Sequence, residues 1–156
     1  MRSSKRLPIK VIDLSAFRNP VVKRAYEYWT DKSASGRLPS RSDIKPQELH
    51  GLLPWLFLVD VLRAPLRFKF RLVGTELTRW AGREYTGIVI GDRDCEESWQ
   101  QAFDDFRSVV DVRVPRYDQR QAPWMSLEFP RFERILAPLS SDESTVDMLF
   151  GALHVL

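Results

Sequence analysis

Cysteine and histidine are scarce in this sequence of 156 residues. The single cysteine, Cys95, excludes an intramolecular disulfide and any zinc site built from cysteines. The two histidines, His50 and His154, lie far apart in the sequence, so a surface or hydrogen-bonded side chain is the simpler interpretation of each. We therefore expect no metal and no cofactor.

Long apolar runs are also missing. No stretch approaches the roughly 18 consecutive apolar residues that suggest a membrane-spanning helix. The first ten residues, MRSSKRLPIK, include basic side chains but not the apolar core of a signal peptide. Together with the lone cysteine, these absences predict a cytoplasmic protein without a membrane span.

Common catalytic motifs are absent as well. The sequence contains neither the Gly-x-Ser-x-Gly turn of a serine hydrolase nor a phosphate-binding Walker loop. Two pairs of adjacent acids, Glu96–Glu97 and Asp104–Asp105, would diverge by about 100° on a helix, so they indicate a solvated acidic face. We therefore expect a protein that is not an enzyme.

Positive charge is concentrated at one end of the chain. Lysine and arginine number 24 against 21 acidic residues, and residues 1–12 contain four of these basic side chains and no acid. The remaining residues carry 20 basic and 21 acidic side chains, so the excess belongs to the N-terminal segment. We expect residues 1–18 to form a basic, flexible tail, and we expect no nucleic-acid partner.

Hydrophobic residues, at 44%, are abundant enough for the core of a single globular domain. Ser, Gly, Pro and charged residues gather between positions 32 and 45, a composition typical of a loop. We expect residues 19–45 to form a helix and its linker, and residues 46–156 to form the main domain.

The helix at residues 20–31 has clear sequence signals. Asn19 is a favourable N-cap and Pro20 suits the first helical position. Val22, Tyr26 and Trp29 follow at helical spacing and form an apolar stripe. Because aromatic anchors dominate protein interfaces, we expect these three side chains to form the interface of a homodimer. The alternative is that the stripe covers the open face of the chain's own sheet.

The middle of the chain predicts two short helices around a hairpin. Residues 46–53 read as a helix that begins at Pro46, and residues 75–81 as one that ends before Gly82. Between them, residues 56–62 and 68–72 are strand-like, and the second alternates so that Phe68, Phe70 and Leu72 share one face.

The last part predicts a long helix followed by strands. Apolar residues at helical spacing cover residues 96–110, and strands are expected at 112–117, 127–139 and 146–156. The last of these is almost entirely apolar, which indicates the centre of the sheet. Gly151 within it indicates a close approach to its backbone.

The predicted order of elements, and several short strings, resemble PAS domains, in particular a small bacterial PAS-related family. The runs that carry the resemblance are SRSDIKPQELHGLLPWLFLVDV at 40–61, RFKFRLVGTELTRWAGREYTG at 67–87 and ERILAPLSSD at 133–142. Within them, the positions that match the family's pattern are Leu38, Pro39, Arg41, Asp43, Ile44 and Pro46, then Arg71, Leu72, Gly74 and Thr75.

The resemblance implies an α+β fold, with a five-stranded antiparallel sheet in the order 2-1-5-4-3 and helices over one face. It also implies sensing or protein interaction rather than catalysis. A flavin photosensor of this fold would carry a cysteine in an Asn-Cys-Arg-Phe context, whereas Cys95 lies in Arg-Asp-Cys-Glu-Glu, so photochemistry is not expected.

Aromatic residues are expected to converge between the sheet and its helices, either as plain core or around a small cavity. Two arginines that follow the long helix could then anchor an anionic group. The candidates for the pocket are Phe70, Leu77, Trp80, Tyr85, Phe103, Phe106, Arg113 and Arg116.

The favoured function is a non-enzymatic sensory or signalling module. It would bind a small apolar or anionic ligand, a regulatory protein or a second copy of itself, since no output segment follows the final predicted strand. The alternative is a cone-shaped α+β enzyme or carrier with an apolar pocket, in which Asp60 would be the base. A weaker hypothesis is nucleic-acid binding through the basic tail.

Overall fold

A computed structural model describes residues 12–91, 97–121 and 131–156. Most of the predicted basic tail, Cys95 and the first residues of the strand predicted from 127 lie outside these ranges. The helices are α1 (Pro20–Lys32), α2 (Thr75–Ala81) and α3 (Glu97–Val112). The strands are β1 (Leu56–Leu62), β2 (Arg67–Val73), β3 (Val89–Gly91), β4 (Arg116–Gln121), β5 (Arg131–Leu139) and β6 (Met148–Val155).

The strands form one antiparallel sheet in the order β3-β2-β1-β6-β5-β4. β6 pairs with both β1 and β5, so the prediction that the apolar C-terminal strand is central is confirmed. The described residues form six strands rather than five. The additional strand, β3, is a three-residue edge beside β2, and it is too short to show an alternating pattern in the sequence.

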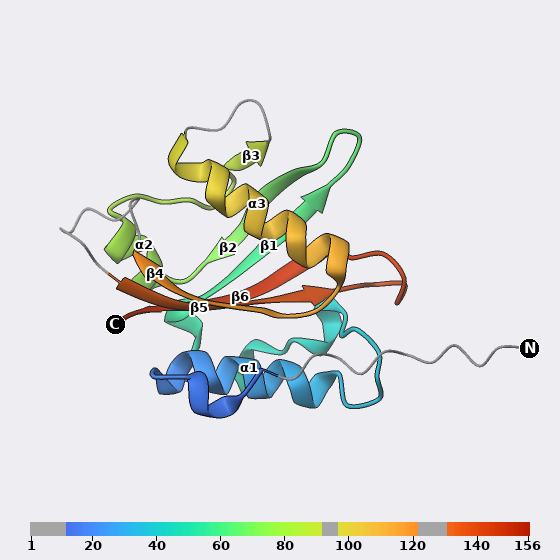
Figure 1. The fold of residues 1–156 in the computed structure, drawn as a ribbon, viewed down its shortest axis with the longest axis horizontal. Coiled ribbons are helices and arrows are strands. Elements are labelled where there is room, and N and C mark those ends of the chain that lie inside the picture. Colours follow the sequence, from blue (N-terminus) through green and yellow to red (C-terminus); the bar gives the residue numbers. More distant parts are fainter. Residues whose placement is uncertain (1–11, 92–96, 122–130) are drawn as a thin grey trace, which may run out of the picture.

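Helices cover both faces of the sheet (Figure 1). α2 and α3 pack over one face, on apolar side chains from β1, β2, β5 and β6. α1 packs on the other face, against β1, β5 and β6. Because β5 and β6 are covered on both sides, apolar residues occupy both faces of these strands.

The apolar stripe of α1 is buried within its own chain. Val22, Tyr26 and Trp29 are only 0, 3 and 1% exposed, and the indole Nε1 of Trp29 donates a hydrogen bond to the carbonyl of Pro138 at 3.0 Å. The prediction that these side chains form a homodimer interface is therefore wrong, because they are buried against β5 and β6 of their own chain. The homodimer itself stays a prediction.

A buried carboxylate accepts hydrogen bonds from the backbone at the start of α1. Glu133 on β5 is 0% exposed and accepts hydrogen bonds from the backbone N–H groups of Arg18, at 2.8 Å, and Asn19, at 3.0 Å. The side chain of Asn19 in turn accepts from the N–H of Val21 at 2.8 Å, which is the predicted N-cap. The same carboxylate accepts from the hydroxyl of Tyr117 at 2.7 Å. The start of α1 is thus tied directly to the sheet.

An irregularity in the β1–β2 pairing changes the face of one predicted core residue. Leu58 pairs with Leu72 but Val59 pairs with Phe70, so Arg71 is an extra residue in β2. Phe68 and Phe70 point into the core as predicted, whereas Leu72 is 43% exposed. The prediction that Leu72 shares their face is wrong, because the extra residue reverses the alternation and turns Val73 inward instead.

Two predicted elements differ in the structure. Residues 46–53 form short 3₁₀ turns, Pro46–Glu48 and Leu53–Trp55, instead of a helix, and Gly51 between them has a positive φ of 80°. The strand predicted at 112–117 begins only at Arg116. α3 continues to Val112, and Arg113, with a φ of 64°, adopts the left-handed conformation that ends the helix.

Candidate functional site

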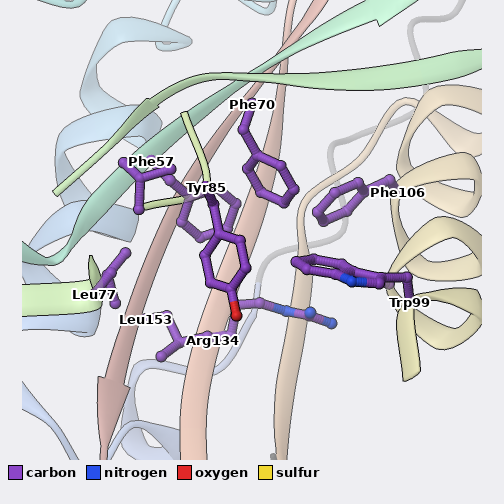
Figure 2. A pocket seen from close by; sticks show the side chains of 10 residues that line it. Phe57, Phe70, Leu77, Tyr85, Trp99, Phe106, Arg134 and Leu153 are labelled. Carbon is purple, nitrogen blue, oxygen red and sulfur yellow. The ribbon is translucent and has the colours of Figure 1, made fainter. Parts of the chain in front are cut away.

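A cavity of about 70 Å³ lies in the core between the sheet, α2 and α3. Its walls come from β1, β2, β5 and β6 below and from both helices above, with Tyr85 supplied by the loop after α2 (Figure 2). The lining residues are Phe57, Phe70, Val73, Leu77, Tyr85, Trp99, Ala102, Phe106, Arg134 and Leu153.

Aromatic rings in mutual contact form much of the cavity wall. Trp99 lies edge-on to Tyr85, with ring centroids 5.0 Å apart and planes at 85°, and it lies 5.6 Å from Phe70. Phe106 meets Phe70 at 6.1 Å in a similar edge arrangement. Such contacts hold the rings in defined orientations, because edge-to-face pairs are favoured over loose stacking. The wall is therefore largely aromatic and apolar.

Arg134 is the single charged residue that lines the cavity among the described residues, and its side chain is only 6% exposed. It lies on β5 between Phe132 and Leu136, on the face that points toward α3. Figure 2 shows its guanidinium end below the ring of Trp99. A buried arginine requires partners, because an uncompensated buried charge is costly.

Two buried carboxylates supply these partners. The Nη2 of Arg134 lies 2.6 Å from an oxygen of Asp105 on α3 and 2.7 Å from an oxygen of Asp118 on β4. Asp105 is 1% and Asp118 8% exposed. The prediction of a solvated acidic face at Asp104–Asp105 is therefore wrong for Asp105, since the helix turns this carboxylate toward the sheet.

Two further arginines close the charged cluster from its outer side. Arg116 lies 3.3 Å from Asp105 and 3.0 Å from Asp118, and Arg120 contacts both carboxylates as well. The cluster thus contains the guanidinium groups of Arg116, Arg120 and Arg134 and the carboxylates of Asp105 and Asp118. It joins α3 to β4 and β5, and Arg134 connects it to the cavity.

Burial disfavours the charged form of two of these arginines. Desolvation lowers the pKa of Arg134, and the neighbouring Asp118 charge opposes this effect. Desolvation also lowers the pKa of Arg120, to about 10, and the positive charge of Arg134 adds to the decrease. Both pKa values are lowered because burial removes water from the guanidinium group, almost completely for Arg134 and in part for Arg120.

Four of the predicted pocket candidates line the cavity: Phe70, Leu77, Tyr85 and Phe106. Phe103 lies one turn away on α3 and is buried, but it packs edge-on against Phe68 with centroids 5.4 Å apart. Trp80 on α2 is half-buried outside the cavity wall, although it packs against the same core. That these residues bind a ligand stays a prediction.

The two arginines predicted to anchor an anionic group do not line the cavity. Arg113 is exposed, and its guanidinium donates to the carbonyl of Glu143 at 2.7 Å, in the loop between β5 and β6. Arg116 is engaged by Asp105 and Asp118 on the outer side of the charged cluster. Arg134 is the arginine that reaches the cavity, and the sequence contained a signal for it: a charged residue between Phe132 and Leu136 on an apolar strand face.

Neither Asp60 nor the histidines contribute to this cavity. Asp60 lies on β1 between Val59 and Val61, which face α3, so its carboxylate is on the opposite face, 3.5 Å from Arg71. It therefore cannot act as a base inside the cavity. His154 stacks on Trp55 with centroids 3.7 Å apart, and His50 is exposed. In the described ranges, no three His, Cys, Asp or Glu residues are placed to hold a metal ion.

Comparison with known proteins agrees with this architecture. The sequence matches the family described as PAS domain over residues 17–154. No curated protein matches the sequence. Every helix in the described part of the chain is too short or too polar to cross a membrane.

Two solved structures are similar in fold. The LOV protein of Rhodobacter sphaeroides aligns with a TM-score of 0.51 and 15% sequence identity, covering 86% of this chain and 68% of the LOV chain. A variant of RsLOV with one aspartate-to-glycine substitution aligns with a TM-score of 0.42 and 18% identity, covering 67% of this chain and 61% of that chain. At such identity the first likeness shows a shared fold alone.

Proposed function

Because the chain belongs to the PAS domain family, we propose that it is a non-enzymatic sensory module that binds a small molecule in the cavity between α3 and the sheet. One observation carries the proposal: between α3 and the sheet, the aromatic side chains leave a cavity of about 70 Å³ where they could have packed together. Native cores are usually close-packed, and cavities with apolar walls and a few polar groups are typical of ligand sites.

A bound molecule would act by changing the balance between conformations of the protein. A ligand shifts such a balance only if it binds one conformation more tightly than another. α3 supplies Trp99, Ala102 and Phe106 to the cavity, and on the same helix Asp105 is held by Arg134. A molecule in the cavity would therefore touch the helix and the arginine that fastens it to the sheet. We propose that the two conformations differ in the position of α3 relative to the sheet.

The remaining parts of the proposal concern the setting in which the module works. We propose a cytoplasmic protein that passes its signal to a regulatory protein or to a second copy of itself. Since the stripe of α1 is used within the chain, a homodimer would need another surface. In the described part of the chain, β3 and β4 are the edges of the sheet. At the β3 edge, Leu72 on β2 and Val89 on β3 are exposed and could contribute to such a surface.

Native mass spectrometry of the full chain purified from cells tests the proposal. We expect a fraction of the protein to retain a small molecule, released on denaturation. Ala102→Leu should abolish this retention, because a leucine side chain would occupy the cavity that Ala102 lines. Arg107→Leu is the matched control, since it introduces the same side chain at an exposed position of α3.

Two results would contradict the proposal. The cavity is only a packing defect if the native protein carries no small molecule and no compound in a metabolite library raises the melting temperature of the native protein or of Arg107→Leu. If Ala102→Leu and Arg107→Leu retain the same molecule equally, binding occurs at another place on the surface.

A further inference from the structure

The guanidinium of Arg134 is incompletely satisfied by the protein. Its Nη2 contacts Asp105 and Asp118, but its Nε is buried and has no hydrogen-bond partner in the described part of the chain. A buried donor without an acceptor is unfavourable, because the group has lost its hydrogen bonds to water without replacing them. Arg134 is also the single charged side chain on the cavity wall in the described ranges. The unpaired donor therefore belongs to a residue that lines the cavity.

The charges around Arg134 do not balance. Among the residues that the structure describes, its cluster contains three guanidinium groups, from Arg116, Arg120 and Arg134, and two carboxylates, from Asp105 and Asp118. One positive charge remains, and the side chains of Arg116 and Arg120 that carry part of it are 37 and 30% exposed. Arg134, at 6%, is shielded from water and has the least access to solvent counter-ions. An additional anion beside Arg134 would neutralise the cluster.

We propose that the cavity binds a short-chain monocarboxylate, with its carboxylate on the Nε of Arg134 and its apolar chain against Phe70, Trp99 and Phe106. This inference rests on the proposed function and specifies its ligand class. A guanidinium group favours carboxylate geometry, and one negative charge matches the one excess positive charge.

The shape and lining of the cavity favour this class over other anions. A phosphate carries more charge and needs several donors, whereas the described lining residues contribute one charged side chain among aromatic and aliphatic ones. The volume of the cavity limits the number of carbon atoms in the acid. An engineered apolar cavity of about 150 Å³ holds benzene, so a cavity of about 70 Å³ suits an acid of roughly two to four carbons.

The experiment compares acids with uncharged molecules of the same shape. Acetate, propionate and butyrate are titrated into the full-length protein at pH 7, and acetamide, propionamide and butyramide serve as neutral partners. Heteronuclear NMR follows the Nε–H signal of Arg134. The part of the fluorescence change that is lost in Trp99→Phe reports on the cavity wall. We expect at least one acid to bind about tenfold more tightly than its amide and to shift the Arg134 signal.

Two variants locate the charge that is responsible. Arg134→Gln should abolish the preference for acid over amide, whereas Arg116→Gln, which removes the excess positive charge but leaves the Nε donor of Arg134 on the cavity wall, should reduce the preference and retain part of it. If Arg134→Gln does not fold, the comparison of acids and amides on the native protein still decides the question. Loss of the preference in Arg116→Gln but not in Arg134→Gln would overturn the assignment.

The outcomes separate this inference from the proposed function. If the amides bind as tightly as the acids, the ligand is neutral and Arg134 is structural, while a ligand-binding cavity stands. If retained molecules from cells lack a carboxylate, the inference also fails and the function stands. If native mass spectrometry finds no retained molecule and neither acids nor amides perturb Trp99, both proposals fail.

Discussion

The ring of Phe57 on β1 lies directly over the backbone of Gly151 on β6. The two residues are opposite each other in the antiparallel register, and a Cβ atom added to Gly151 would overlap the ring. The missing side chain of Gly151 therefore leaves the space that the tip of the Phe57 ring occupies. Phe57 also contacts Phe70 and Phe106, with centroids 6.5 Å away in each case, so this pair helps to set the position of the aromatic wall.

Gly151→Ala should destabilise the protein by about 1–3 kcal/mol, because the added methyl group must push Phe57 out of its position. Urea denaturation measures the loss. The double variant Gly151→Ala with Phe57→Leu should recover part of it, and a double-mutant cycle gives the coupling. Gly91→Ala is the control, since its Cβ would lie 3.4 Å from a flexible Arg67 side chain. Equal losses at Gly91 and Gly151 would show that the contact with the ring of Phe57 is not the cause of the loss.

Trp29→Ala should cost about 3–5 kcal/mol of unfolding free energy, because this side chain is 1% exposed and its indole donates to Pro138. The loss should be independent of protein concentration, since the stripe packs within one chain. Arg24→Ala on the exposed side of α1 should change stability by no more than about 0.5 kcal/mol. Light scattering on the same samples reports the oligomeric state. A dimer that dissociates in Trp29→Ala without loss of monomer stability would restore the dimer interface originally expected on α1.

Phe103→Ala should also cost about 3–5 kcal/mol, because Phe103 is 2% exposed and packs against Phe68 in the core. Since Phe103 does not line the cavity, ligand affinity in the folded fraction should be much less affected than stability. Thermal unfolding and ligand titration are measured on the same preparation. Asp111→Ala, at an exposed position of α3, is the control. A small stability loss would mean that the phase of α3 differs from the structure.

Asp142, in the loop between β5 and β6, should make stability depend on acidic pH. Its carboxylate accepts hydrogen bonds from the backbone N–H groups of Thr145, at 2.8 Å, and Ser144, at 2.9 Å, and from the hydroxyl of Ser140, and these bonds lower its pKa from 3.8 to about 2. Because the folded pKa lies below the unfolded value, the stabilisation is fully present above about pH 4 and is lost as the pH falls toward 2.

The test compares the native protein with Asp142→Asn by urea denaturation between pH 2 and pH 7. The native protein should be the more stable of the two above about pH 4, and the difference should shrink toward pH 2. Asp111→Asn controls for the removal of one exposed negative charge. A difference that stays constant over the whole range would mean that the Asp142 carboxylate is not held by these donors in solution.

Local patterns in the sequence were enough to predict most of the fold. Asn19 and Pro20 determine where α1 begins, since capping depends on residues within one turn. The apolar run at β6 predicted its central place, and Gly151 predicted a close approach that proved to be the ring of Phe57. Four pocket candidates, among them Phe70 and Phe106, lie where strand and helix periodicity placed them.

Only the tertiary structure decided which apolar and charged groups satisfy one another. Periodicity shows that the stripe of Trp29 must be covered, but whether a second chain or the chain's own β5 and β6 covers it depends on the packing of distant segments. The same holds for Arg134 and Asp105, which lie 29 positions apart in the sequence and meet only because α3 crosses β5. The sequence pattern places Arg134 on an apolar strand face, but burial and charge balance are properties of contacts between distant residues, so spacing along the chain could not show that its Nε lacks an acceptor among the described residues.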